Sequence, residues 1–390
     1  MSVTALKSAP AQSTTDWQAI ACELAPHFGE RAAVVDEEDR FVASNYVDLK
    51  ASGLVSAAVP LELGGGGANH AQMCEIVREL ARHCGSTALA FSMHTHQVVT
   101  NAWRWRHAKA PVDGLLKRVA QERIILLSSG GSDWLHGSGT ATRVEGGYRV
   151  NARKIFSSGA PAGDLLLTSA VYEDPQSGPT VLHFGVPMTA EGVRIESTWR
   201  AMGMRGTGSH DIVISDFFVP DAAVGGKRPQ GKWHLLFHII SMIAIPLIYS
   251  TYVGVAEAAR DLALRQAAKR RGDHHLIHLV GGMENELAAA RLALADMIAA
   301  AARDEPGPAT TNRVFVARTL VARAAIATVE LTMEVSGGSA FYRGNHLERL
   351  FRDVQGARYH PLQEGVQREY AGRMALGLDL DGGPTNSRRD

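Results

Sequence analysis

The spacing of apolar residues changes twice along the chain. Between residues 16 and 122 apolar side chains recur three and four positions apart, as in Met73, Ile76, Val77, Leu80 and Ala81, which predicts amphipathic helices. Between 123 and 225 the pattern breaks into short β-rich runs separated by turn residues. Long helical patterns return after 225. The pattern alone therefore predicts helices, then a small β-domain, then helices again.

These patterns give element ranges and boundaries that a structure can test. We expect strands at 124–127, 147–150, 165–171, 181–186, 193–196 and 212–219, and later helices at 253–268, 283–302, 313–334 and 362–376. The predicted regions are a loose tail at 1–15, an N-terminal helical domain at 16–122, a middle β-domain at 123–225 and a C-terminal helical bundle at 226–390.

One apolar stretch, 235–256, is long enough to raise the question of a membrane span. It carries His238, Ser241 and Tyr249, and Pro246 stands in its middle. Polar groups at these depths fit a helix buried in protein better than one in lipid. We expect a buried helix that begins near Pro246, where proline suits a first turn, and no membrane partner.

Composition excludes several partner classes. The 40 basic and 40 acidic residues cancel, so no footprint for nucleic acid or an anionic membrane is visible. The cysteines Cys22, Cys74 and Cys84 lack metal-ligand spacing and are odd in number, which favours reduced thiols, no metal site and a cytoplasmic location. The N-terminal residues are small and polar and do not resemble a signal peptide.

The most informative stretch is a glycine-rich turn that leads into a strand. Gly203, Gly206 and Gly208 allow backbone conformations closed to other residues and expose N–H groups to a ligand, and the strand at 212–219 stops at Pro220. The pattern suits the approach of a flat, polar-edged cofactor, although ordinary turns have the same composition.

This turn resembles a family signature. Gly203-Met-Arg-Gly-Thr-Gly-Ser-His-Asp211, followed by a strand ending in Phe-Val-Pro, is similar to the β-domain signature of the acyl-CoA dehydrogenase superfamily. Segments 53–60, 63–67, 79–90, 336–338 and 347–353 resemble its other signatures, in the same order. The resemblance implies an α+β fold of an N-terminal helical domain, a middle β-barrel or β-sandwich domain and a C-terminal four-helix bundle. It also implies a flavin, FAD ahead of FMN, between the β-domain and the bundle.

The resemblance assigns flavin contacts to two turns. The first, Leu127-Ser-Ser-Gly-Gly-Ser-Asp133, keeps the family's Gly-Ser-Asp but lacks its Glu-Pro, and the second, Ile155-Phe-Ser-Ser-Gly159, has Ile155 where the family has a stacking Trp. Hydroxyl groups there can donate to flavin carbonyls. The implied cofactor-binding residues are Ser128, Ser129, Ser132, Ser157 at the N5/O4 edge, and Ser158. The alternative is serines in ordinary strand-to-turn transitions.

The adenine end of the cofactor is implied to meet a partner subunit. The family's Arg and Gln are replaced here by Ala268 and Glu334, so Arg270, Gly337 and Gly338 become the candidates, because a guanidinium suits a pyrophosphate. A solvated basic helix end is the alternative for Arg270.

Two residues compete for the catalytic position. Glu364, in a Glu-Gly pair, resembles the family's base, and burial beside an apolar ligand would raise its pKa toward neutrality; the alternative is a solvated residue in a helix's first turn. His360, which is followed by Pro361 and comes shortly after Arg352-Asp353, resembles the histidine of the flavin monooxygenase branch, which serves the oxygen chemistry or activates a substrate hydroxyl. Substrate contacts are expected from His94, His96, Ser241 and Tyr249, although a lone histidine is more often structural.

Three functions follow from these residues. The first is α,β-dehydrogenation of an acyl thioester, with Glu364 as base and a flavin as hydride acceptor. The alternative is an O₂-dependent flavin monooxygenase that uses His360, and the third is a non-catalytic binding descendant of the fold. The implied partners are an acyl thioester or another apolar small molecule, and either an electron-transfer protein or O₂. The apolar stretches 235–256 and 287–302 predict a homodimer or homotetramer built through the C-terminal helices.

Overall fold

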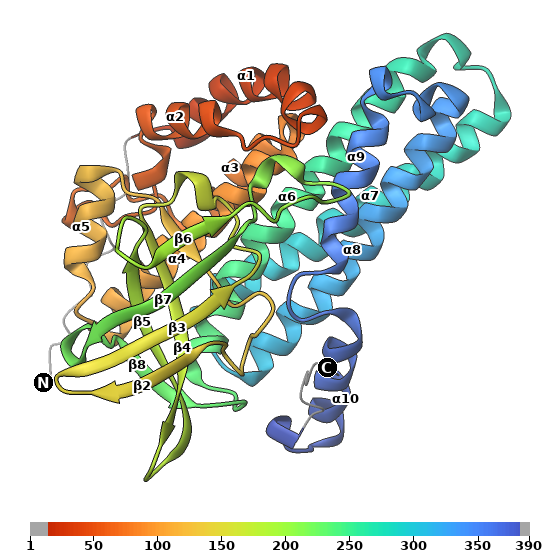
Figure 1. Cartoon of the computed structure of the whole chain (residues 1–390). Helices are drawn as coiled ribbons and strands as arrows, with labels where there is room; N and C mark the ends of the chain where they lie inside the picture. The colour runs from red at the N-terminus through yellow and green to blue at the C-terminus, as the bar shows by residue number, and fades with distance from the viewer. Residues whose placement is uncertain (1–14, 383–390) are drawn as a thin grey trace, which may run out of the picture.

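The computed structural model describes residues 15–382, and the predicted tail at 1–15 lies almost wholly outside this range. Helices come first in the chain, a sheet follows, and a second set of helices ends it (Figure 1). The sheet lies on one side of the long helix α6, and α7 and α8 lie on the other. The predicted fold class, α+β with three regions in this order, is confirmed.

Five α-helices form most of the N-terminal region from residue 15 onward. Their bounds are α1 Trp17–Glu37, α2 Ala43–Ala51, α3 His70–His83, α4 Gly85–Ala108 and α5 Asp113–Glu122. A capping box starts α3, where the side chains of Asn69 and Gln72 each accept from the other residue's backbone N–H. The apolar face that the sequence predicts, including Met73, Leu80 and Ala81, is buried. Helix α4 is buried along most of its length, so its polar side chains must find partners inside the protein.

The middle region is one mixed sheet in the order β6-β7-β3-β2-β4-β5-β8, with β1 added beside β4. The pairs β1–β4 and β2–β4 are parallel and the others antiparallel. The strands are β1 Leu126–Ser128, β2 Thr140–Val144, β3 Gly147–Lys154, β4 Leu165–Asp174, β5 Gly178–Pro187, β6 Val193–Glu196, β7 Asp211–Pro220 and β8 Gly226–Pro229.

Two of these strands, β2 and β8, were not predicted. Strand β2 buries only Ala141, and β8 reads Gly-Lys-Arg-Pro, so neither carries the apolar run that marks a strand in sequence. Their backbone pairing with β3 and β5 holds them instead. Because β8 follows residue 225, the sheet extends four residues past the predicted end of the middle domain.

Up to residue 382 the C-terminal region contains five α-helices. They are α6 Leu235–Ala267, α7 His274–Ala301, α8 Pro308–Ser336, α9 Leu347–Val354 and α10 Glu364–Leu376. Helix α6 packs against α3 and α4 as well as against α7 and α8. It therefore contributes to both main hydrophobic cores: Met242 and Leu247 to the N-terminal one, and Ile245 and Tyr252 to that of the bundle.

The start of α6 corrects the prediction that this helix begins near Pro246. The helix begins at Leu235 and Pro246 lies inside it. An interior proline costs about 3 kcal/mol because one backbone hydrogen bond is lost, but the surrounding apolar side chains are buried on every face. By length and composition α6 is the one helix among residues 15–382 that could cross a membrane, and 94% of its apolar window is buried inside the protein.

Candidate functional site

The first predicted flavin turn follows β1 and leaves open space beside its glycines. Ser128 ends β1 half-buried, and the hydroxyl of Ser129 lies 2.7 Å from that of Thr168 on β4. A Cβ added to Gly131 would meet nothing within 4 Å. Ser132 is half-buried in the same turn. The turn therefore offers hydroxyl groups beside room for a ligand.

A buried ion pair anchors this turn. The Nζ of Lys154 lies 3.3 Å from the Asp133 carboxylate and donates to the carbonyl and hydroxyl of Ser138 at 2.8 and 3.0 Å. Lys154 is 1% exposed. Its burial lowers the pKa of the ammonium group, against the opposing effect of Asp133. Because Lys154 ends β3, the pair joins the first turn to the second.

The second turn directly follows Lys154. Ser157 is fully buried, and its hydroxyl donates to the Lys154 carbonyl at 3.2 Å, so the hydroxyl predicted to meet the flavin edge is engaged within its own turn. The Ser158 hydroxyl lies 2.7 Å from that of Ser209 in the glycine-rich turn. Phe156 is 55% exposed at a φ of 57°, a sparsely populated conformation for an aromatic residue, and its ring lies edge-on to Trp199.

The glycine-rich turn differs from its prediction. Two of its backbone N–H groups are engaged within the protein: that of Met204 donates to Asp353 at 2.5 Å and that of Gly206 to the hydroxyl of Ser86 at 3.2 Å. A Cβ at Gly203 would lie 2.3 Å from the carbonyl oxygen of Arg352. These glycines therefore permit close packing between the sheet region and the helices.

The residues around the first two turns fit a flavin. The turns lie against each other, since a Cβ at Gly159 would sit 3.7 Å from the Leu127 side chain. Within residues 15–382 the indole N–H of Trp134, next to the first turn, is buried without a hydrogen-bond partner. Buried N–H groups rarely stay unpaired, so a ligand with carbonyl acceptors would satisfy this one. Hydroxyl donors, open space and an unpaired N–H together suit the polar edge of an isoalloxazine.

The catalytic candidate His360 is half-buried and contacts buried polar side chains of α6 and α8 through the segment after α9. Its Nε2 lies 2.5 Å from the Tyr252 hydroxyl. The Nη2 of Arg318 donates to the carbonyls of Ala357, Arg358 and His360 at 3.2, 3.1 and 2.8 Å. Burial, assisted by the charge of Arg318, lowers the pKa of His360 to about 3. The imidazole is therefore neutral at physiological pH.

The other catalytic candidate, Glu364, does not have the environment that a general base requires. Its carboxylate forms ion pairs with Arg323 and, at 2.5 Å, with Arg368, and its side chain is 36% exposed. Hydrogen bonding from Arg323 lowers the pKa of Glu364 rather than raising it. The structure thus contradicts the predicted burial and raised pKa. Glu364 occupies the first turn of α10, as the alternative interpretation expected.

The two candidate histidines on α4, His94 and His96, make structural contacts. His94 accepts at Nδ1 from the N–H of Leu126 at 3.0 Å and lies 2.8 Å through Nε2 from the carbonyl of Val55, which joins β1 to the N-terminal region. His96 contacts the Ser92 carbonyl of its own helix at 3.3 Å. Burial lowers the pKa of both to about 4. Neither ring is free to bind substrate through the nitrogens that make these bonds.

The remaining substrate candidates lie on α6 and use their hydroxyls within the protein. Ser241 donates to the carbonyl of Phe237 in its own helix at 2.6 Å. Tyr249 donates to the Ala357 carbonyl at 2.7 Å, so it supports the His360 segment rather than pointing a hydroxyl at a ligand. Both residues are fully buried, and their hydroxyls are engaged within the protein rather than offered to a substrate.

The candidates for the adenine end gather elsewhere. Arg270 follows α6 and its Nη2 donates to the Val335 carbonyl at 2.6 Å, two residues before Gly337 and Gly338. These three residues are exposed at the end of the bundle farthest from the sheet (Figure 1). Within one chain they therefore do not join the flavin turns.

The sequence interpretation missed Lys154 and Arg318 and did not assign Tyr252 to His360. Lys154 adjoins a recognised motif, but nothing in sequence marks it as buried. Arg318 interrupts the alanine-rich face of α8 at a helical spacing where an apolar residue is expected, and this interruption could have marked it in the sequence.

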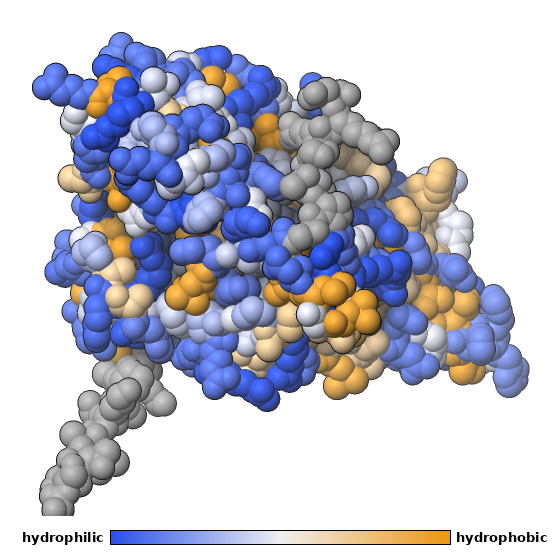
Figure 2. Space-filling model, turned by 90° about the horizontal axis from the view of Figure 1, so that it is seen from below, coloured by the Kyte–Doolittle hydropathy of each residue, from blue (hydrophilic) through white to orange (hydrophobic). Residues whose placement is uncertain are grey.

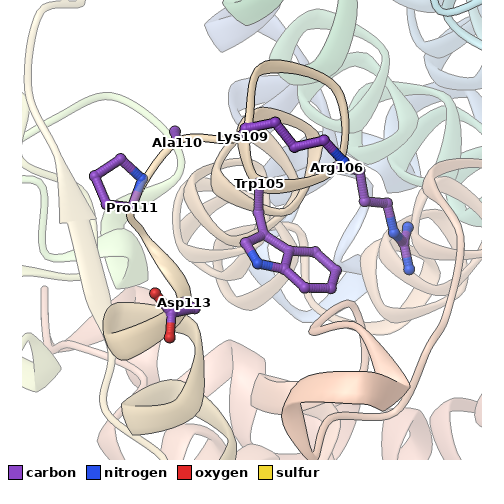
Figure 3. Close-up of a pocket in the computed structure, with 6 residues that line it drawn as sticks. All are labelled: Trp105, Arg106, Lys109, Ala110, Pro111 and Asp113. Carbon is purple, nitrogen blue, oxygen red and sulfur yellow. The ribbon is translucent and has the colours of Figure 1, made fainter.

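A surface hollow of about 420 Å³ lies at the turn between α4 and α5, where Trp105, Arg106 and Lys109 line it (Figure 3). None of the residues that line it was a predicted site residue.

Family models match nearly all of this architecture. The acyl-CoA dehydrogenase N-terminal domain matches residues 18–105, the middle domain 128–217 and the C-terminal domain 247–364. The putative acyl-CoA dehydrogenase YdbM of Bacillus subtilis (strain 168) is 30% identical over 374 residues, 88% of this chain and 92% of the relative. The chain therefore belongs to the acyl-CoA dehydrogenase superfamily.

Other relatives are named as nitrososynthases and monooxygenases. The amino sugar nitrososynthase RubN8 of Streptomyces rubradiris is 29% identical and covers 91% of this chain and 88% of its own length. A dibenzothiophene monooxygenase of Mycolicibacterium goodii is also 29% identical, over 83% of this chain and 84% of the relative. The structure of KijD3 with FMN and a dTDP-linked amino sugar superimposes with a TM-score of 0.86 at 26% identity and covers 95% of this chain and 97% of that chain. The chain is thus a flavin-dependent enzyme of this superfamily.

Proposed function

We propose that the chain is an O₂-dependent flavin monooxygenase acting on a small-molecule substrate. One oxygen atom of O₂ enters the substrate, the other leaves as water, and bound reduced flavin supplies the two electrons and two protons. The observation that carries the proposal is the contrast between the two catalytic candidates: His360 is neutral and hydrogen-bonded to the buried Tyr252, whereas Glu364 is paired with two arginines. Similarity to nitrososynthases and to a dibenzothiophene monooxygenase supports it.

In this proposal His360 is the catalytic residue. A neutral imidazole can donate a hydrogen bond to a reacting oxygen and does not place a full positive charge beside it.

The second candidate function is α,β-dehydrogenation of an acyl thioester, which similarity to YdbM favours. That chemistry needs a carboxylate base, and Glu364 has a lowered pKa and two cationic partners.

For the cofactor we propose FAD, held by the first two turns of one subunit and by Arg270, Gly337 and Gly338 of another. The separation of these groups within one chain supports this arrangement, because only a neighbouring subunit could bring them together. Replacing Arg270 by Ala should weaken FAD binding and leave FMN binding unchanged, since FMN lacks the adenine end. Fluorescence titration of the apoprotein with each flavin measures both affinities, and equal losses would refute this placement.

We propose a homo-oligomer built through the C-terminal helices. The side chains of α6 that motivated this expectation are buried within the chain, but α7 and α8 expose Leu292 at 73% and Leu320 at 50%, and Phe341 beyond α8 is 89% exposed. Apolar residues are visible on the bundle side of the molecule, at the right of Figure 2. Light scattering at micromolar concentration should give a dimer or tetramer, and a monomer would contradict the proposal.

The experiment that tests the function follows isotopic oxygen. The protein, loaded with flavin and reduced without air, is mixed with ¹⁸O₂ and one of four probes: octanoyl-CoA, indole, dibenzothiophene or a dTDP-linked amino sugar. Mass spectrometry then seeks one ¹⁸O atom in the product. His360→Ala should lower ¹⁸O incorporation at least about a hundredfold, while Glu364→Gln should leave it near the wild-type level.

The dehydrogenase gives the reverse result. Octanoyl-CoA would then bleach the oxidised flavin without air, Glu364→Gln would slow the bleaching, and no ¹⁸O would enter any product. That outcome would overturn the monooxygenase proposal.

A further inference from the structure

The hydroxyl of Tyr252 determines which nitrogen of His360 carries the proton. Tyr252 is fully buried, and His360 Nε2, at 2.5 Å, is the one acceptor that its hydroxyl reaches among the described residues. A buried hydroxyl must donate its proton to some acceptor. Nε2 of His360 therefore accepts, and in the neutral imidazole the proton resides on Nδ1.

The other ring nitrogen is left available. Across residues 15–382 no group hydrogen-bonds Nδ1 of His360, and this atom is not among the buried polar atoms that lack a partner. Nδ1 therefore keeps access to solvent or ligand while the opposite edge of the ring is fixed. The ring is further confined by the rings of Tyr252, at 5.5 Å, and Tyr249, at 6.2 Å.

Arg318 fixes the backbone that carries the ring. It is 1% exposed, and a single nitrogen, Nη2, reaches three of the four carbonyls of the 357–360 segment. Its guanidinium also lies over the ring of Tyr249, at 5.3 Å from the centroid. These contacts hold the segment after α9 against α8 without a carboxylate.

We propose that Tyr252 and Arg318 are positioning residues that present His360 to the site as an Nδ1–H hydrogen-bond donor. The inference rests on the proposed catalytic role of His360. Tyr252 selects the tautomer and Arg318 fixes the main chain. The donor meets the reacting oxygen in its correct orientation, so no reorganisation is needed when the oxygen develops charge.

Tyr249 supplies a matched control for Tyr252. Both tyrosines lie on α6, three residues apart, and both are fully buried. Their ring centroids lie 6.2 Å (Tyr249) and 5.5 Å (Tyr252) from that of His360. The Tyr249 hydroxyl, however, donates to the Ala357 carbonyl and not to the imidazole. Replacing either residue by Phe removes one buried hydroxyl from the same helix, but only Tyr252→Phe removes the bond to His360.

The test is a direct measurement of the tautomer. Long-range ¹H–¹⁵N correlation spectra of protein labelled with [¹⁵N]histidine distinguish a protonated from an unprotonated ring nitrogen, and the His360 signals are assigned by their loss in His360→Gln. We expect protonated Nδ1 and unprotonated Nε2 in the wild type and in Tyr249→Phe. In Tyr252→Phe we expect the two nitrogens to move toward intermediate shifts, since the proton then divides between them.

The outcomes separate this inference from the proposed function. A wild-type His360 protonated at Nε2, or Tyr252→Phe spectra identical to those of the wild type, would overturn the inference whether or not the enzyme incorporates oxygen. The wild-type spectrum decides the tautomer even if Tyr252→Phe does not fold. A correct tautomer with no ¹⁸O in any product would instead remove the function. When both hold, Tyr252→Phe should lower the ratio of oxygenated product to hydrogen peroxide about tenfold, and Tyr249→Phe should lower it less.

Discussion

His94 provides the sharpest test of the distinction between a structural and a substrate-binding histidine. It lies 1% exposed on α4 and bridges the Leu126 N–H of β1 to the Val55 carbonyl. Replacing it by Phe keeps a ring that can pack on Phe91, whose centroid lies 5.9 Å away, but removes both bonds. Each orphaned buried group costs about 1–3 kcal/mol, so we expect His94→Phe to lower the free energy of unfolding by about 4 kcal/mol.

His96→Phe is the matched control. His96 is buried on the same helix two residues later, but its Nδ1 contacts the Ser92 carbonyl of its own helix and its Nε2 the side chain of Gln97. That carbonyl keeps its helical environment when the ring is replaced, so the loss should be about 1 kcal/mol. Urea unfolding followed by tryptophan fluorescence measures both variants at pH 7.5. If His96→Phe is as damaging as His94→Phe, the structural role assigned to His94 is wrong.

The pH dependence gives an independent readout of the same residue. Burial lowers the pKa of His94 from 6.5 to about 4, so between these values the unfolded chain binds a proton that the folded protein does not. Stability from this group is therefore fully present above pH 6.5 and is lost as the pH falls toward 4, by about 1.4 kcal/mol per pH unit and about 3 kcal/mol in all. In His94→Phe the slope of the unfolding free energy against pH should fall by about 1.4 kcal/mol per pH unit in this window, because one fewer proton is taken up on unfolding. An unchanged slope would refute the assignment.

Two further predictions concern the turns. Asp133→Asn leaves Lys154 buried without its carboxylate, so it should lower the free energy of unfolding in urea by about 3 kcal/mol and weaken flavin binding. Adding Lys154→Met to the same chain should recover part of the stability. An unchanged free energy of unfolding in Asp133→Asn would contradict the buried ion pair. Gly203→Ala should lower the free energy of unfolding by on the order of 3 kcal/mol, because its Cβ meets a carbonyl oxygen. Gly131→Ala should change it by less than about 0.5 kcal/mol. Equal shifts in melting temperature for the two variants would show that the glycine-rich turn is not a packing junction.

Periodicity and motif order predicted the regions of the fold, because apolar spacing reports which face of a helix or strand is buried. The same signal could not show β8, which is polar and held by backbone pairing alone, or the true start of α6, where burial on all sides overrides the proline. Local propensity does not contain that tertiary contribution.

The sequence marked the two turns, which lie against each other in the structure, but it could not show what each side chain contacts. The flavin contacts of the serines stay a prediction, and Ser157 uses its hydroxyl within its own turn. Glu364 was misjudged because sequence does not reveal Arg323, which meets it from α8, although Arg368 stands four residues further along the same helix. The partners of His360 lie 42 and 108 positions away in the chain, so only the fold could reveal them.

Helix α6 has a consequence for how this protein can be divided. Because one helix supplies side chains to the core beneath the N-terminal helices and to the core of the bundle, neither core is complete without it. The three regions that the family models match are therefore not independent folding units. A chimera that exchanges the N-terminal region with that of a relative would have to carry the first half of α6 along, and a cut at residue 225 or 235 would leave an apolar face without its complement on both fragments.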